Sequence, residues 1–141
     1  MGFDLSIAYY ALPYLLKGAW VTIKIACVSY FIGFILGTIL GFLQTRNSKL
    51  LSIPITIYVI LIRGTPMLIQ ITFFYYVLPL IGIDLSHFWA ATYAIALNSS
   101  AYISQIVKSG IAAVGKEQIE AARVLGLSSF QIARYIVNPQ A

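Results

Sequence analysis

The chain has 141 residues, about the length of one domain. Sixty per cent of them are hydrophobic, 9% are charged and the mean hydropathy is +0.90, whereas a soluble domain carries about 25% charged residues. So few charges cannot cover a water-exposed surface, which excludes a soluble globular enzyme and a disordered tail. The net charge of +5 is spread thinly and gives no nucleic-acid footprint. A single cysteine, Cys27, excludes an internal disulfide and a multi-cysteine metal centre.

Three apolar stretches, residues 25–43, 50–83 and 88–107, predict an all-α integral membrane protein with three transmembrane helices. The second stretch would reach roughly 50 Å as a straight helix, beyond a hydrocarbon core of about 30 Å. It is also too short for two spans and a turn. We therefore expect one span that bends at Arg63-Gly64-Thr65-Pro66, because Pro66 cannot donate a backbone hydrogen bond to the preceding turn.

The N-terminal residues 1–18 are expected to lie outside the cytoplasm. They lack the basic start of a signal peptide, and residues 5–16 are interpreted as a segment on the membrane surface. The first loop carries two basic residues and four follow the third span, whereas Asp84 is the only full charge in the second loop. Since basic loops stay in the cytoplasm, the N-terminus is predicted outside, although Lys17 and Lys24 favour the opposite orientation.

Small residues in the first span predict close helix packing. Gly33, Gly37 and Gly41 form two overlapping G-x-x-x-G steps on one helix face. Missing side chains at every fourth position let another helix backbone approach closely. We expect this span to belong to a helix bundle rather than to bind a ligand.

Polar residues interrupt the third span. Asn98, Tyr102, Gln105 and Ser109 are spaced so that they share one face of a helix, and Ser99 lies beside them in the sequence. Carboxamides that face lipid would lack hydrogen-bond partners. The stripe therefore faces either a neighbouring helix, as hydrogen-bonding glue, or a path for a polar solute; Asn98, Ser99, Tyr102 and Gln105 are the candidate path residues.

Arg63 is the one charge within the second apolar stretch. A guanidinium in the bilayer is costly and usually pairs or extends to the membrane surface. No acid lies near Arg63 in the sequence, so it either extends toward the inner surface or contacts helix-end carbonyls and a partner subunit. We interpret Arg63, Gly64, Thr65 and Pro66 as a bend with a gating role.

The segment 115–139 is predicted to be an amphipathic cytoplasmic tail. Residues 116–125 favour a short helix that Gly126 ends, and residues 128–131 form a capping-box pattern that opens a second helix. Ala121 and Ala122 would leave the first helix approachable, which suits docking into a groove of another protein. An interfacial helix on lipid is the less favoured interpretation, because the helix carries few basic residues.

The sequence shows no catalytic residues, metal ligands or cofactor site. Residues 110–116 fit the start of a phosphate-binding loop, but Glu117 stands where a hydroxyl must bind magnesium. His87 has no recognisable catalytic partner and is interpreted as a loop or interface residue.

Three motifs resemble those of ABC importer membrane subunits of the polar amino-acid branch, the glutamine and histidine type. Residues Glu120-Ala121-Ala122, Gly126, Ile136 and Pro139 follow the spacing of the E-A-A-x3-G-x9-I-x-L-P signature, with Asn138 in place of the usual Leu. Residues 63–70 are similar to R-G-T-P-x-x-x-Q, and residues 98–102 to N-S-G-A-Y.

The resemblance implies a type-1 transmembrane domain of five spans over residues 19–141 and beyond, in the bacterial inner membrane with the N-terminus outside. It implies a second permease subunit, cytoplasmic ATPase subunits that dock on the coupling segment, and a periplasmic amino-acid-binding protein. ATP hydrolysis would occur in the separate ATPase, and the cargo would be a polar amino acid, with glutamine preferred.

This sequence departs from the family pattern at several positions. Ser100 replaces a common Gly, Gln105 a common Glu and Lys108 a common Arg, so the charge pair usual there is missing. The chain also ends at Ala141, where two further spans are expected. A membrane assembly or scaffold fragment that transports nothing is therefore the alternative function.

Overall fold

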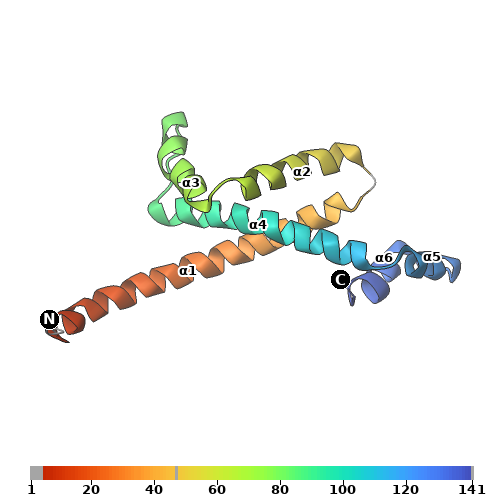
Figure 1. Cartoon of the computed structure of the whole chain (residues 1–141), viewed down its shortest axis with the longest axis horizontal. Coiled ribbons are helices and arrows are strands. Elements are labelled where there is room, and N and C mark those ends of the chain that lie inside the picture. Colours follow the sequence, from red (N-terminus) through yellow and green to blue (C-terminus); the bar gives the residue numbers. More distant parts are fainter. Residues whose placement is uncertain (1–4, 47, 141) are drawn as a thin grey trace.

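The computed structural model describes residues 5–46 and 48–140, with side chains from Tyr9 onward. These residues form helices and connecting turns, with no strand among them (Figure 1). The elements in chain order are α1 (Leu5–Gln44), α2 (Lys49–Gly64), α3 (Met67–Thr72), the π-helical turn η1 (Phe73–Val77), the 3-10 turn η2 (Leu78–Ile81), α4 (His87–Ala113), α5 (Lys116–Val124), α6 (Ser129–Ile132) and the π-helical turn η3 (Ala133–Val137).

Helix α1 is longer than the predicted first span at residues 25–43. It runs unbroken for 40 residues and includes Pro13, and a helix of that length extends about 60 Å. Residues 5–18 therefore belong to the same helix as the predicted span, and the expectation that residues 1–18 lie outside the cytoplasm stays a prediction. The long apolar sequence sustains the helix through Pro13.

One described helix, Tyr9–Gln44, has the length and hydropathy to cross a membrane by itself. A second candidate is the bent pair Lys49–Gly64 and Met67–Ile81, whose axes differ by 104°. Helix α4 has 27 residues but a more polar sequence. Length and hydropathy alone do not establish a span, so the number of three spans remains a prediction.

The contact between α1 and α4 organises the fold, and the two helices cross along much of α4 (Figure 1). Gly33, Gly37 and Gly41 are buried in this contact. A β-carbon at Gly37 would lie 2.7 Å from the carbonyl oxygen of Ser100 and 2.7 Å from the β-carbon of Ile103. Similar distances, 2.7 and 2.8 Å, apply at Gly33 and Gly41. The glycines allow the two backbones to approach more closely than any side chain would permit.

Small residues on α4 match those on α1. Thr92, Ser100 and Ser104, at intervals of four or eight residues, are fully buried, as is Ser29 on α1. Ser100 and Ser104 direct their hydroxyls to carbonyls of their own helix, those of Leu97 at 2.9 Å and Ala101 at 2.8 Å. The Ser100 and Ser104 hydroxyls are therefore satisfied within α4, whereas Ser29 Oγ on α1 has no partner among the described residues.

Helix α2 packs against α4 beside α1. Ile55, Val59 and Ala101 form a small apolar core between α2 and α4, and Leu40 and Leu43 of α1 pack against the same core. The Tyr58 hydroxyl lies 2.8 Å from the Leu97 carbonyl oxygen, to which it donates, and 2.7 Å from the Ser100 hydroxyl. Helices α1, α2 and α4 thus meet at one apolar core.

The bend at residues 63–66 is confirmed, and its structure explains how it is held. Thr65 and Pro66 are extended, with ψ of 139° and 137°, as expected for a residue before proline and for the proline itself. The break leaves the Ile62 carbonyl without its helical donor. The Gln70 side chain replaces it, because Gln70 Nε2 donates to the Ile62 oxygen at 2.7 Å and to Thr65 Oγ1 at 2.9 Å.

The glycine contact predicts opposite effects for the same change at two positions of α1. Gly37→Ala should lower stability by about 1–3 kcal/mol, because the new methyl group meets backbone that cannot move away. Gly18→Ala should be neutral or slightly stabilising, since nothing lies within 4 Å of its β-carbon position. Thermal unfolding of both variants in detergent measures this. Equal effects at the two glycines would contradict the packing argument.

The hydrogen bonds of Gln70 predict different effects on the bend for substitutions at Gln70 and at Pro66. Gln70→Leu should loosen the bend at a cost of about 0.5–1.5 kcal/mol, because the Ile62 carbonyl loses its 2.7 Å hydrogen bond and keeps only the longer one from Thr65 Oγ1 at 3.3 Å. Pro66→Ala should leave the bend in place while Gln70 still spans it, because the Gln70 hydrogen bonds to Ile62 and Thr65 do not depend on the proline ring. Spin labels at Ile57 and Thr72 report the angle between α2 and α3. A straightened Pro66→Ala variant would contradict the role given to Gln70.

Candidate functional site: a polar groove between two helices

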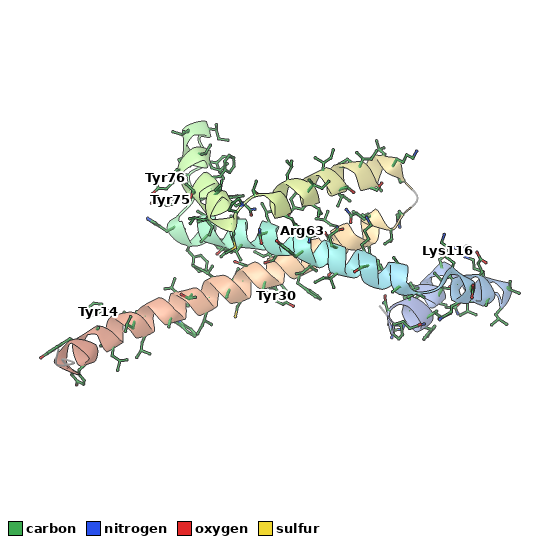
Figure 2. The ribbon with its side chains drawn as sticks, in the orientation of Figure 1. Tyr14, Tyr30, Arg63, Tyr75, Tyr76 and Lys116 are labelled. Carbon is green, nitrogen blue, oxygen red and sulfur yellow. The ribbon has the colours of Figure 1, made fainter. Side chains whose placement is uncertain are left out.

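A groove of about 380 Å³ lies between α2 and α4. Its polar lining comes from Thr56 and Arg63 on α2 and from Tyr102 and Gln105 on α4. The Arg63 guanidinium carbon is 4.8 Å from the centroid of the Tyr102 ring (Figure 2 labels Arg63). The lining continues with the apolar Val59 and Ile60 and with Gly64.

Arg63 carries a charge that its surroundings balance only in part. A cation over an aromatic face gains about 0.5–2 kcal/mol, whereas an arginine in the middle of a bilayer costs at least about 2.5–3.5 kcal/mol. No Asp or Glu occurs between residues 5 and 83 or between residues 85 and 116. The stacking on Tyr102 therefore orients the guanidinium toward α4 without neutralising it.

The polar stripe of α4 divides into two contacts. Asn98 Nδ2 donates to Gln70 Oε1 at 3.2 Å, which ties α4 to the bend. Gln105 Nε2 donates to Gln44 Oε1 at 2.8 Å, and Gln44 Nε2 lies 3.4 Å from Thr56 Oγ1. The carboxamides of Asn98 and Gln105 thus form hydrogen bonds between helices, as one of the two interpretations expects. Tyr102 and Gln105 also line the groove.

Two residues of the predicted stripe lie elsewhere. Ser99 faces α1, since its β-carbon would be 2.8 Å from a β-carbon placed on Gly33. It is therefore outside the groove, because a neighbour in sequence points about 100° away around a helix. Ser109 is exposed and donates to the Ile106 carbonyl at 3.0 Å.

Gln44 and Gln70 are the residues that sequence reasoning left out of the site. Both are buried, with exposed fractions of 6% and 8%. Gln44 is the last residue of α1 and looks like an ordinary boundary residue. Gln70 ends the stretch that is similar to R-G-T-P-x-x-x-Q, which marks the residue but not its contacts. The tertiary contacts with Gln105 and Asn98 reveal their roles.

The tail is a small folded unit at the end of α4 (Figure 1). Helix α5 ends as expected, with Gly126 in the left-handed region at φ 81°, and the predicted capping box is present, with Ser128 Oγ accepting from the Gln131 amide and Gln131 Oε1 accepting from the Ser128 amide. The left-handed glycine and the box turn the chain back on itself.

Ala122 does not lie on the exposed surface of α5, contrary to the expectation for a docking alanine. It is 3% exposed and packs in an apolar cluster with Val114, Ile132 and Val137. Ile136 packs against the same cluster. The other predicted coupling residues, Glu120, Ala121, Gly126 and Pro139, are exposed.

Exposed apolar side chains complete the outer surface of the tail. Val124 is 88% exposed, Leu125 78% and Phe130 74%. The buried cluster fixes how these side chains are presented, because Ala122 and Ile132 anchor α5 and α6 to each other. Sequence reasoning missed this apolar surface, since it took the alanines as the contact.

A second polar contact lies at the opposite end of α4. The Tyr75 hydroxyl is 2.7 Å from His87 Nε2, and the two rings are 4.9 Å apart (Figure 2 labels Tyr75). His87 is the first residue of α4. The pair joins η1 to the start of α4, in line with the interpretation of His87 as a loop or interface residue.

The chain is similar to several transport proteins. It is 37% identical over its whole length to the arginine transport system permease protein ArtQ of Bacillus subtilis and 34% identical over its whole length to the glutamine transport system permease protein GlnP of Escherichia coli. In both cases the chain spans 65% of the relative's length.

Solved structures agree with these relatives. A crystal structure of an amino acid ABC transporter with histidines superposes with a TM-score of 0.87 at 35% identity, covering 99% of this chain and 65% of the other. An inward-facing structure of the MetNI methionine ABC transporter gives a TM-score of 0.74 at 24% identity, covering 92% and 63%, and supports the fold alone.

The family model described as the binding-protein-dependent transport system inner membrane component matches residues 33–141. That range includes the glycine contact, the bend, the groove and the tail. The chain belongs to this family of ABC transporter permeases.

Proposed function

We propose that this chain acts in the permease subunit of an ATP-driven importer that moves a polar amino acid, with glutamine as the preferred candidate, across the bacterial inner membrane. The observation that supports the proposal is the groove between α2 and α4, which Arg63, Tyr102 and Gln105 line on an otherwise largely apolar helix pair and in which the Arg63 guanidinium lies over the Tyr102 ring. The family membership and the names of the relatives agree with it. Helices α1, α2–α3 and α4 form three of the spans, with the N-terminus outside.

Four kinds of partner follow from this function. Cytoplasmic ABC ATPase subunits would supply the energy, a second permease subunit would complete the path, and a periplasmic binding protein would deliver the amino acid. Membrane lipid would surround the exposed apolar side chains of α1, and nucleic acid has no place in the function. Switching between outward and inward access would occur by rigid-body movement of helices.

Coupling would occur at the exposed surface of the tail. Glu120 and Ala121 on α5, together with Gly126 and the apolar Val124 and Leu125, form a compact projection. Ala122 and Ile136 support it from inside through the apolar cluster. A rigid projection of this kind can transmit a push from the ATPase to α4, from which it follows directly in the chain.

If the polar stripe lines a path for solute, the reaction rates of introduced cysteines should follow a different order from the exposed fractions of the side chains in this chain. In a background lacking Cys27, a cysteine at position 102 should react faster with a charged, membrane-impermeant thiol reagent than one at position 106. Ile106 is the more exposed side chain, 68% against 46% for Tyr102, but it would face lipid, where a thiol does not ionise. The assembled importer in membrane vesicles is the sample.

Faster reaction at position 106 would contradict the path interpretation and favour the scaffold alternative. Positions 98 and 105 should behave like position 102. Leu97 and Ile103 serve as further controls, since they lie on other faces of α4 and Ile103 packs against Gly37.

The coupling interpretation predicts that Gly126→Val separates ATP hydrolysis from transport. Valine at φ 81° costs about 1 kcal/mol or more in backbone strain and alters the end of α5. Membrane insertion should be unchanged, while recovery of the ATPase in a pull-down and solute-stimulated hydrolysis should both fall. Gly115→Val is the matched control, because Gly115 at the other end of α5 has φ −57° and also lies in open space.

Equal recovery of the ATPase by wild type and Gly126→Val, with equal hydrolysis, would overturn the docking assignment. If wild type recovers no ATPase even with all partners present, the scaffold alternative becomes the better account.

A further inference from the structure

Two lysines of α1 do not fit the pattern of basic residues that predicts the orientation of the chain. Lys17 and Lys24 precede the contact with α4, whereas Arg46 and Lys49 follow the other end of α1. The side chains of Lys17 and Lys24 are exposed. The stretch 5–83 contains no acid, so this part of α1 presents positive charge only.

The length of α1 places Lys24 at a membrane surface. Lys24 precedes Gln44, the last residue of α1, by 20 residues, which is about 30 Å along a helix and matches the thickness of the hydrocarbon core. Residues 25–43 between them carry no charge. With Gln44 at one surface of the membrane, Lys24 therefore lies at the other.

The contact with α4 supports the same position for the membrane surface. A β-carbon on Gly33 would lie 2.8 Å from the carbonyl oxygen of Ala96, and one on Gly41 would lie 2.8 Å from that of Ser104. The two helices thus run in the same direction, and their register puts the start of α4, at His87, at about the level of Lys24. Trp20 and Trp89, the two tryptophans of the chain, then both lie within two turns of that level. Tryptophan is enriched at membrane surfaces.

Lys17, Trp20 and Lys24 share one face of α1, because they are spaced three and four residues apart. Lys24 Nζ lies 5.3 Å from the centroid of the Trp20 ring. Tyr14 and Tyr10 continue this face toward the N-terminus (Figure 2 labels Tyr14). We call these five residues the basic–aromatic stripe. A hollow of about 550 Å³ lies beside Tyr10, Tyr14 and Lys17.

The opposite face of this part of α1 is apolar. Leu12, Leu15, Ala19 and Ile23 lie about half a turn away from the stripe. A helix with lysine and aromatic residues on one face and aliphatic residues on the other lies with its aliphatic face toward the acyl chains and its basic face toward the headgroups. The stripe is therefore at the depth and in the orientation to contact lipid phosphates.

We propose that the basic–aromatic stripe binds the phosphates of anionic phospholipids, such as phosphatidylglycerol, where the α1 span reaches the membrane surface. Lys17 and Lys24 supply the charge, and the hydroxyls of Tyr10 and Tyr14 donate to phosphate oxygens. Trp20 is a positioning residue, which holds the Lys24 ammonium group at the level of the headgroups. The inference rests on the membrane position proposed for α1 and is independent of the transported solute.

The test uses Cys27, the only cysteine of the chain, which is exposed about one turn from Lys24. A bimane fluorophore is attached to Cys27 in the assembled importer, with cysteine-free partner subunits, in phosphatidylcholine vesicles. Brominated phosphatidylglycerol or brominated phosphatidylcholine is added at equal mole fraction, and the quenching gives the relative binding of each lipid near the stripe. Phosphatidylglycerol should bind about 5- to 25-fold more strongly, since each lysine contributes about 5-fold.

Two variants separate the stripe from the overall charge of the chain. Combining Lys17→Gln with Lys24→Gln should bring the two lipids to nearly equal binding. The matched control keeps composition and net charge but moves each lysine by one position around the helix. It combines Lys17→Gly with Gly18→Lys, and Ile23→Lys with Lys24→Ile. Both new positions have room, because nothing lies within 4 Å of the β-carbon position of Gly18 and Ile23 is exposed. This variant should also lose most of the preference.

Two further measurements identify the ligand as a lipid. Raising the sodium chloride concentration should weaken the preference, because salt screens exposed charges. Inorganic phosphate in excess should weaken it no more than sodium chloride of equal ionic strength, since the free ion lacks the acyl chains that hold a lipid beside α1. Flotation with the vesicles shows that each variant is inserted.

Four results would overturn the inference. Equal binding of the two lipids to the wild type would assign the stripe to a protein surface, such as a second permease subunit. A preference that survives loss of both lysines would place the lipid elsewhere, and one that survives their displacement would leave no role for the stripe. Displacement by inorganic phosphate would assign the stripe to a soluble anion. Uptake of radiolabelled L-glutamine tests the transport function separately, so uptake without lipid preference would refute only the inference.

Discussion

The close approach of α1 and α4 is the constraint on which the rest of the structure depends. In lipid the hydrophobic effect gives no net attraction between helices, so their association depends on packing and hydrogen bonds. The three glycines remove the side chains that would separate the backbones, and any β-carbon there would lie within 2.8 Å of α4. With one face of α4 in contact with α1, α2 packs on the adjacent face, where Leu40 and Leu43 of α1 also contact the core. The groove between α2 and α4 lies next to this three-helix contact.

Side-chain hydrogen bonds then fix the positions of the helices that the glycine contact does not determine. Gln70 completes a carbonyl that the bend exposes and also accepts from Asn98, so one carboxamide joins α2, α3 and α4. Gln44 and Gln105 do the same for α1 and α4 at the other end. These carboxamides hydrogen-bond to one another across the helices, whereas the exposed Arg63 side chain contacts α4 through the face of the Tyr102 ring.

The tail is stabilised by a small apolar core of its own, as in a small soluble domain, rather than by one long apolar helix. Two short helices and a turn bury Ala122, Ile132 and Val137 together, since neither helix is long enough to be stable alone. The burial of Ala122 leaves its neighbours, among them Ala121, Val124 and Leu125, on the exposed surface of the tail.

The sequence alone determined the features that depend on local chemistry. Low charge and long apolar runs specify membrane helices, Pro66 specifies extended backbone at Thr65, Gly126 permits the left-handed turn, and Ser128 with Gln131 specifies a cap. Each of these follows from neighbours within a few residues, so no tertiary information is needed. The sequence did not predict that residues 5–24 continue α1, because Pro13 indicated an interruption. Proline is tolerated inside apolar membrane helices more often than inside helices of soluble proteins.

Only the tertiary structure decided which residues meet. The pairing of Gln70 with Asn98, of Gln105 with Gln44 and of Arg63 with Tyr102 joins positions far apart in the chain, and no local pattern encodes such distances. The placement of Ser99 against α1 and of Ala122 inside the tail was decided in the same way, because one residue's step around a helix changes the neighbour it faces. Helical periodicity predicts that residues share a face, and packing decides what that face contacts.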